Sequence, residues 1–257
     1  MIGRAEPSVG LQEVLVIDLD RTITRQGTYS FFLLFAAMRL APWRLVMVPA
    51  VVIAMVAYKA NLISRKRLKE IMFRLILGRR VAKESMSDVV RKFAQYQLQH
   101  NIYPQARAMI AAAGDRPVIL ATAAHRFYAE TIAAALDIPH VVATDSVMDA
   151  THIYAAIEGE NCYGIHKTRA ISALLARFDV PRDRMLVYYV ADDISDLPSF
   201  EWSEVPIVVN AKPKLAALAA ARTWPVLDWR RSPASSGAGA PDDASIFSTP
   251  SHIDVQT

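Results

Sequence analysis

The sequence contains a single cysteine, Cys162. One thiol cannot form a disulfide within the chain, and it excludes a zinc site with several cysteine ligands. So little cysteine is typical of a protein from a reducing compartment. We interpret Cys162 as a small buried apolar residue, which is a commoner role for an isolated cysteine than that of a reactive thiol.

The first residues lack the apolar core of a secretory signal. The segment "MIGRAEPSVGLQE" (1–13) contains charges and a proline but no long apolar run. We therefore expect no cleaved export signal and a cytoplasmic location for the folded part of the protein.

Acidic residues are scarce in one part of the chain. Residues 39–92 contain 13 Lys or Arg but three acids, whereas the rest contains 16 basic and 22 acidic residues, for a net charge of +4. One segment thus carries all the positive excess. No nucleic-acid recognition motif and no aromatic array accompanies these basic residues, so we expect no nucleic acid as a partner.

Short β-rich runs alternate with helical patterns in most of the chain. The runs are 14–19, 117–122, 140–145, 185–191 and 206–210, and helical spacing lies near 126–136, 167–178 and 213–221. Runs this continuously apolar are typical of strands covered on both faces. We predict an α/β fold, a parallel sheet between two layers of helices.

Two segments depart from this alternation. Residues 26–105 show helical patterns and no convincing strand, which predicts an all-helical insertion after the first strand. The tail 232–257 is rich in Ser, Ala, Gly, Pro and Asp, and we predict that it is disordered. The predicted core therefore comprises residues 1–25 and 106–231.

Polar residues follow the predicted strands at their carboxyl ends, where open α/β sheets bind ligands. They are Asp18, Asp20, Thr122, Asp192, Asp193 and Asp196, and Lys167 begins a helix. A single aspartate after a strand is often a turn or capping residue. Several such placements together are hard to explain by capping.

Clustered carboxylates in a cleft repel one another unless a cation is present. Mg²⁺ is a hard cation that prefers oxygen ligands, and it answers this need. The cluster therefore predicts phosphoryl transfer assisted by Mg²⁺.

These residues resemble the motifs of the haloacid dehalogenase superfamily. "DLDRT" (18–22), at the end of the first predicted strand, is similar to the DxDxT signature, and "ILAT" (119–122) is similar to the second motif. Lys167 is similar to the third motif, and "DDISD" (192–196) to the acidic fourth motif. Their order and spacing over about residues 13–230 resemble the phosphoserine-phosphatase-like branch, subfamily IB. The resemblance implies a Rossmann-like core with a helical cap inserted between the first two motifs.

The resemblance also implies the catalytic roles. Asp18 would be the nucleophile that forms an aspartyl-phosphate, and Asp20 the general acid and base. Because Asp18 and Asp20 are two residues apart in the predicted strand, we expect their side chains to point to the same face of the sheet.

The remaining roles implied are ligand contacts. Mg²⁺ would be held by the Asp18 carboxylate, the Asp20 carbonyl and the Asp192 carboxylate, and Asp196 would hold a metal-bound water or orient Lys167. Thr122 and Lys167 would bind the phosphoryl group.

Two residues depart from the family pattern. Arg21 and Asp193 stand where the family usually has glycine or another small residue. We expect Asp193 to add negative charge beside the metal and so to alter the affinity of the site for the metal. Aspartate tolerates a left-handed backbone better than most residues do. A catalytically silent binding or membrane protein with this fold is the alternative from another functional class.

The insertion contains an unusually apolar pair of stretches. "LVMVPAVVIAMVAY" (45–58) carries no charge, follows "FFLLFAAM" (31–38), and is too short to span a bilayer. The two stretches either pack on each other in the cap or approach a membrane. Flanking basic residues, among them "RKRLK" (65–69), are attracted to anionic lipid, and we expect a membrane surface as a partner.

The insertion also bears on the substrate. No acid occurs between Asp20 and Glu70, whereas similar phosphoserine phosphatases have one there to hold the substrate ammonium group. A lipid-linked or other anionic phosphomonoester therefore fits better than phosphoserine, an arrangement similar to phosphatidylglycerophosphate phosphatases of this branch. His125 and Arg126 either line the entrance or form a solvated loop.

Overall fold

The computed structural model describes residues 11–230 and residue 247. Its central sheet has the strand order β4-β3-β1-β7-β8-β9, and all neighbouring strands are parallel. The strands are β1 (Gln12–Ile17), β3 (Val118–His125), β4 (His140–Thr144), β7 (Met185–Ala191), β8 (Val205–Val209) and β9 (Val226–Leu227). The predicted parallel α/β fold is confirmed. Because β1 lies between β3 and β7, the residues that follow these three strands meet at one edge.

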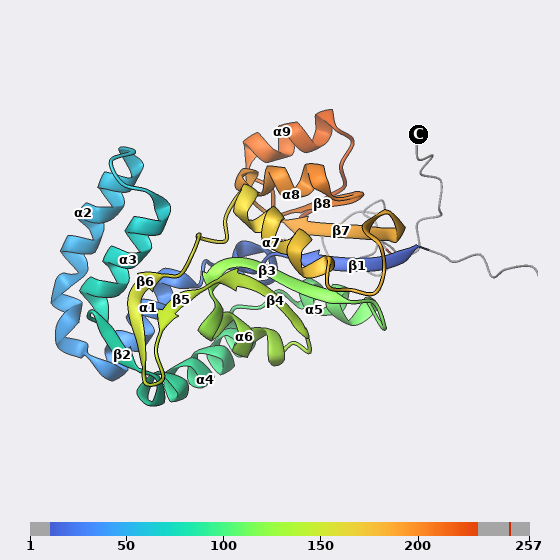
Figure 1. Ribbon diagram of the computed structural model, residues 1–257. Helices are drawn as coiled ribbons and strands as arrows, with labels where there is room; N and C mark the ends of the chain where they lie inside the picture. Colours follow the sequence, from blue (N-terminus) through green and yellow to red (C-terminus); the bar gives the residue numbers. More distant parts are fainter. Residues whose placement is uncertain (1–10, 231–246, 248–257) are drawn as a thin grey trace, which may run out of the picture.

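Helices cover both faces of this sheet (Figure 1). They are α5 (Pro104–Ala112), α6 (Arg126–Ala134), α7 (Ile165–Leu175), α8 (Leu197–Trp202) and α9 (Pro213–Ala221). Leu15 and Ile17 of β1 pack in one hydrophobic cluster with α5 and α6, and Val14 and Val16 pack in the other with α7, α8 and α9. Alternate residues of β1 thus enter opposite layers, which explains the unbroken apolar run.

The strand predicted at 117–122 extends further than expected. Strand β3 ends at His125, and its pairing with β4 is irregular between Ala121 and His125. Thr122 therefore comes directly after the last regular pair. The short strand β9 and helices α5 and α8 were not among our predictions, because their periodic patterns are brief.

The insertion contains α1 (Tyr29–Leu40), a 3₁₀ turn (Pro42–Met47), α2 (Val48–Lys59), α3 (Arg65–Ile76) and α4 (Lys83–His100). Its two ends are held together, since Thr24 and Ile102 form a β-bridge and the Arg25 N–H donates to the Asn101 carbonyl at 2.7 Å. Phe32 of α1 stacks on Tyr128 of α6 with ring centroids 4.5 Å apart. The insertion therefore packs directly on the core.

One short strand interrupts the helices of the insertion, where we predicted none. Strand β2 (Arg80–Ala82) pairs with β6 (His152–Ile157), and β6 pairs with β5 (Ser146–Met148), in an antiparallel sheet. The Asp149 side chain accepts the N–H groups of Thr151 and His152 and so turns the hairpin. A segment following β4 thereby extends to the insertion (Figure 1).

The apolar stretch of the insertion is longer and more exposed than we expected. The 3₁₀ turn and α2 form one helical stretch of 18 residues, Pro42–Lys59, which by length and composition is enough to cross a membrane. It is only 11% buried. Packing of the apolar stretches 31–38 and 45–58 on each other within the cap therefore does not bury Pro42–Lys59. The tail prediction for 232–257 lies outside the described residues except for Phe247.

Candidate active site

Asp18 is the first residue after β1. Its N–H donates to the Val190 carbonyl of β7 at 2.9 Å, and the residue is 5% exposed. The next residues, Leu19–Ile23, form a tight turn and not a continuation of the strand. Our expectation that Asp18 and Asp20 share a strand face is therefore wrong. The turn itself brings both side chains to the wall of one cavity.

The turn requires a left-handed residue at Arg21, with φ of 66°. The Thr24 hydroxyl accepts the Arg21 N–H at 3.2 Å, and the Asn210 amide donates to the Arg21 carbonyl at 3.0 Å. Such a backbone disfavours residues with a Cβ atom by about 1 kcal/mol. The two hydrogen bonds hold the strained conformation in place.

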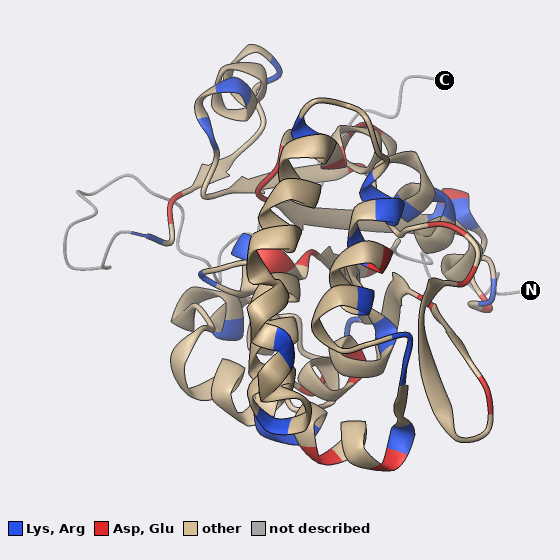
Figure 2. Cartoon of the chain, turned by 90° about the vertical axis from the view of Figure 1, so that its left-hand side faces the viewer, with Lys and Arg blue, Asp and Glu red and all other residues tan. Residues whose placement is uncertain are grey.

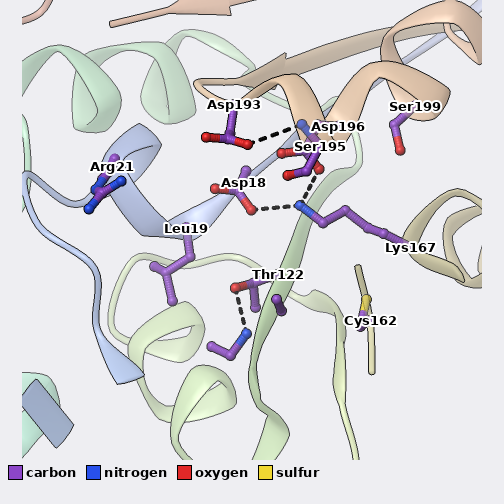
Figure 3. A network of polar contacts seen from close by, with 12 residues as sticks. Asp18, Leu19, Arg21, Thr122, Cys162, Lys167, Asp193, Ser195, Asp196 and Ser199 are labelled. Atoms are coloured by element: carbon purple, nitrogen blue, oxygen red, sulfur yellow. Dashed lines mark hydrogen bonds and ion pairs between the residues drawn. The ribbon is translucent and has the colours of Figure 1, made fainter. Parts of the chain in front are cut away.

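Lys167 lies between two carboxylates (Figure 3). Its Nζ is 2.8 Å from Asp18 Oδ1 and 2.6 Å from Asp196 Oδ1, and the Tyr189 hydroxyl donates to the same Asp196 oxygen at 3.0 Å. Burial alone would lower the pKa of Lys167, but the charges of Asp18 and Asp196 raise it well above its usual value. Lys167 is therefore charged, and Asp196 orients it.

The carboxylates outnumber this buried cation. Burial raises the pKa of Asp18 to about 8 despite the attraction of Lys167, and burial together with Asp193 raises the pKa of Asp192 to about 7. Both shifts come chiefly from burial, and the neighbouring carboxylates add to them, so ionised carboxyl groups at these positions need a nearby cation. A further cation would lower both pKa values.

Mg²⁺ fits this donor set. Asp18 and Asp192 are both 5% exposed and both offer oxygen atoms. Within residues 11–230 no three Asp, Glu, His or Cys side chains lie close enough to form a cage by themselves. A bound ion would therefore need carbonyl oxygens or water as well, which is common for Mg²⁺.

Asp20 ties the turn to the insertion. Its Oδ1 accepts the N–H of Thr28, the residue that precedes α1, at 2.6 Å. Thr28 in turn contacts the Tyr128 hydroxyl at 3.1 Å. The carboxyl group predicted as the acid and base is thus positioned by the first turn of the insertion.

Thr122 is completely buried on the strand beside β1. Its hydroxyl oxygen accepts the Ala124 N–H at 3.0 Å, as the lower dashed line of Figure 3 shows. Because this bond uses a lone pair, the hydroxyl proton can still be donated to a ligand.

Asp193 is paired with a lysine, although its charge still contributes to the raised pKa of Asp192. Lys212 Nζ lies 2.6 Å from its Oδ2, and the Ser195 N–H donates to its Oδ1 at 3.0 Å. Partial burial would raise the pKa of Asp193, but these contacts lower it below its usual value. Its backbone is extended, with φ of −121°, so the left-handed conformation that we considered for it is wrong.

A cavity of about 860 Å³ joins Asp18, Asp20, Lys167, Asp192 and Asp196 to the insertion, whereas the buried Thr122 is not part of its lining. Its lining acids are Asp18, Asp20, Asp192, Asp193 and Asp196, all on the core side. The insertion contributes apolar side chains and two cations, namely Phe31, Leu34, Met55, Tyr58, Leu68, Met72, Arg65 and Lys69. The cavity thus has an acidic end and an apolar, basic end.

A family model of the haloacid dehalogenase-like hydrolases matches residues 15–201, which include every one of the motif residues. The chain belongs to the haloacid dehalogenase-like hydrolases. The family predicted from the four motifs is confirmed.

Two curated relatives of this hydrolase come from Mycobacterium tuberculosis. They are "Probable phosphatase Rv3661" of strain H37Rv and "Uncharacterized protein MT3761" of strain CDC 1551, each 30% identical over 155 residues. The alignments cover 60% of this chain and 50% of each relative. The chain thus spans about half the length of the curated relatives it matches.

Solved structures share the fold of this hydrolase. A protein of unknown function from Bordetella pertussis Tohama I has a TM-score of 0.77 at 22% identity, over 85% of this chain and 99% of that one. A phosphoserine phosphatase, solved as a phospho-aspartyl intermediate analogue, has a TM-score of 0.58 at 14% identity, over 86% and 95%. The predicted core with its inserted cap is confirmed.

Lys69 is a site residue that our reading of the sequence misplaced. We assigned it to a basic surface flank, but its side chain is buried and its Nζ donates to Asn161 Oδ1 at 2.8 Å and to the Ala123 carbonyl. Burial and then the charge of Arg65 lower the pKa of Lys69 to about 7. The signal was its helical spacing: Lys69 lies on the same side of α3 as buried Met72 and Phe73.

His125 and Arg126 match neither of the roles we considered. The His125 ring is buried, with Nδ1 2.7 Å from the Ser146 hydroxyl, and it does not line the cavity. Arg126 pairs with Asp145 and donates to the Val141 carbonyl at 2.9 Å. Both residues hold the segment after β4 in place.

Proposed function

We propose that this hydrolase is a Mg²⁺-dependent phosphomonoesterase that works through an aspartyl-phosphate. The observation that carries the proposal is the buried ion pair of Asp18 and Lys167, with Asp20 on the wall of the same cavity. A carboxylate held against a lysine at a strand end is placed to attack a phosphoryl group whose negative charge the lysine then stabilises.

The phosphoryl group is transferred twice, first to Asp18 and then to water, and Asp20 moves one proton in each step. An Asp18 oxygen attacks phosphorus in line, the bond from phosphorus to the ester oxygen breaks, and Asp20 gives its proton to the leaving oxygen. Asp20 then takes a proton from water, which attacks the aspartyl-phosphate and releases inorganic phosphate and free Asp18. Lys167 and the Thr122 hydroxyl stabilise the charge on the phosphoryl oxygens throughout.

The metal would be held by Asp18, Asp192 and the Asp20 carbonyl, with Asp196 orienting Lys167 or a metal-bound water. Mg²⁺ supplies positive charge beside the phosphoryl oxygens when bound. The burial of Asp18 and Asp192 among other acids of the cavity supports this assignment, because ionised carboxylates there need a cation.

Release of phosphate from an aryl phosphate tests the proposal. We expect Mg²⁺-dependent release by the wild type and none by Asp18→Asn, which keeps the shape of the side chain. Asp20→Asn should slow formation or breakdown of the intermediate, and beryllium fluoride should be trapped by wild type but not by Asp18→Ala. A wild type no more active than Asp18→Asn would favour the catalytically silent alternative.

We propose a lipid-linked or other anionic phosphomonoester as the substrate. The insertion lines its end of the cavity with Phe31, Leu34 and Tyr58, and it adds Arg65 and Lys69 near the acidic end. Apolar walls suit a hydrocarbon, and Arg65, together with Lys69 in its protonated form, suits a second anionic group. The same reasoning supports an anionic membrane as the place where the substrate is met.

Phosphoserine phosphatase activity is the competing function, because several structural neighbours carry that name. Every acid of the described cavity lining lies on the core side, so the insertion contributes no carboxylate to the cavity that could hold a substrate ammonium group. A panel containing a phosphatidylglycerophosphate, phosphoserine and sugar phosphates separates the two. Phosphoserine as the best substrate would refute the lipid proposal.

A further inference from the structure

We infer that the outer face of Pro42–Lys59 docks on anionic membranes, with the helix lying in the plane of the interface. The inference gives the proposed encounter with lipid a defined surface, and it rests on that encounter but not on hydrolysis. The outer face comprises Trp43, Val46, Met47, Val52, Ile53 and Val56.

This helical stretch is apolar on all sides, yet half of it is uncovered. Val51, Ala54, Met55 and Tyr58 recur at helical spacing on the inner side, where two are buried and two line the cavity. On the outer side Val46 is 71% exposed and Ile53 is 70% exposed. A helix that is apolar all round needs an apolar environment on both sides, and Figure 1 shows α2 at the edge of the molecule, with protein on one side only.

One end of the outer face combines apolar and basic side chains. A surface hollow of about 360 Å³ is lined by Trp43, Val46 and Met47 together with Arg44, Arg74 and Arg79. Trp43 is 69% exposed, and Arg44 is held by hydrogen bonds to the carbonyls of Arg74 and Leu75. Tryptophan beside arginine suits the boundary between lipid tails and phosphate head groups.

The charge around the face selects lipid over a second copy of the chain. Arg39, Lys59, Arg74 and Arg79 are exposed, and no acid occurs between Asp20 and Glu70. Two copies meeting through this face would bring like charges together. Each exposed base near anionic lipid contributes about 1 kcal/mol instead. Figure 2 looks onto this side of the molecule, with Lys and Arg in blue.

The inner contacts keep the helix on the surface of the bilayer. Met55 and Tyr58 are part of the cavity wall, so a spanning helix would remove that wall from the active site. Leu34 of α1 lines the same cavity and is 39% exposed. Docking therefore places lipid beside the insertion that forms this wall of the cavity.

Vesicle sedimentation at low salt tests the surface. Wild type should sediment with vesicles of equal parts phosphatidylcholine and phosphatidylglycerol, far less with phosphatidylcholine alone, and be partly released by high salt. The fluorescence of Trp43 should shift to the blue on binding, and Trp43→Phe should lose most of this shift. A wild type that stays in the supernatant with anionic vesicles would overturn the inference.

Matched variants separate the apolar from the electrostatic contribution. The double variant Ile53→Glu with Val56→Glu should abolish sedimentation. The control double variant Val147→Glu with Val226→Glu changes two exposed valines outside the insertion and should not. Lys59, Arg74 and Arg79 changed to Gln should weaken binding at least tenfold, and Arg177, Arg184 and Lys214 changed to Gln should not. Arg65 and Lys69 are left unchanged because they line the cavity.

The outcomes also distinguish this inference from the proposed function. Asp18→Asn should bind vesicles as wild type does while releasing no phosphate. Full activity on an aryl phosphate without any vesicle binding would overturn the docking surface alone. A dimer in solution that Ile53→Glu with Val56→Glu converts to a monomer would overturn it in favour of a contact between copies.

Discussion

At the scale of single residues, Arg21 is the point where the sequence departs from a backbone requirement. Its φ of 66° belongs to the region that glycine adopts without steric cost. Its side chain is exposed, so replacing it removes little packing. The strain therefore comes from the Cβ atom.

Arg21→Gly should raise the free energy of unfolding by up to about 1 kcal/mol, because it removes this Cβ atom. Urea denaturation measures the change. Arg21→Ala is the matched control, since it loses the same guanidinium but keeps the Cβ atom, and it should not gain stability. Equal effects of the two variants would contradict a backbone origin.

Lys69 makes stability depend on pH. Burial lowers its pKa to about 7, below the 10.5 of an ordinary lysine, so between these values the unfolded chain binds more protons than the folded one. The free energy of unfolding therefore rises with pH in this window, by up to about 1.4 kcal/mol per pH unit from this group.

Lys69→Met should flatten that part of the pH profile between pH 7 and pH 10. Thermal melts of wild type and variant at several pH values measure the difference in slope. Lys214→Met, at an exposed position of α9, should leave the slope as in wild type. If the slope of Lys69→Met equals that of wild type, the pKa of Lys69 in the folded protein is that of an exposed lysine.

At the scale of elements, the start and end of the insertion depend on Asn101. Its side-chain oxygen accepts the Gln26 N–H at 3.0 Å, and its amide donates to Gln97 Oε1 at 2.5 Å. Asn101 is 7% exposed, so these groups find no substitute in water.

Asn101→Ala should therefore lower the free energy of unfolding by about 1–3 kcal/mol, since it leaves buried polar groups unpaired. It should also reduce phosphate release, because the same short segment carries Thr28, which fixes Asp20. Gln99→Ala is the control, because Gln99 is exposed near the end of α4, two residues before Asn101. A variant as stable as this control would show that backbone contacts alone hold the two ends of the insertion together.

At the scale of the whole molecule, insertion and core share one hydrophobic cluster. Phe32 and Phe93 of the insertion and Tyr128 of α6 are all completely buried in it, and the ring centroids of Phe93 and Tyr128 lie 5.8 Å apart. Burial on this scale links the two parts energetically.

We therefore predict a single cooperative unfolding transition for insertion and core. Urea unfolding followed by far-UV circular dichroism and by protease cleavage within the insertion should give the same midpoint. Phe32→Ala should lower the free energy of unfolding by about 3–5 kcal/mol without separating the two curves. A cleavage midpoint well below the other would show an insertion that unfolds by itself.

The sequence by itself determined the features that depend on neighbours along the chain. The parallel α/β fold follows from the apolar runs, and the motif residues Asp18, Lys167 and Asp196 follow from their places after strands and at the start of a helix. The predicted strands and helices agree with the structure because the period of a strand or helix and the position of its end are written in adjacent residues.

Only the tertiary structure decided what distant segments do to one another. Strand β2 exists because a hairpin some 70 residues later pairs with it, and Lys69 can be buried because Asn161 and the Ala123 carbonyl accept its hydrogen bonds. The extended Asp193 is neutralised by Lys212 from another loop. None of these partners is marked in the local pattern, since burial and ion pairing depend on which surfaces the fold brings together.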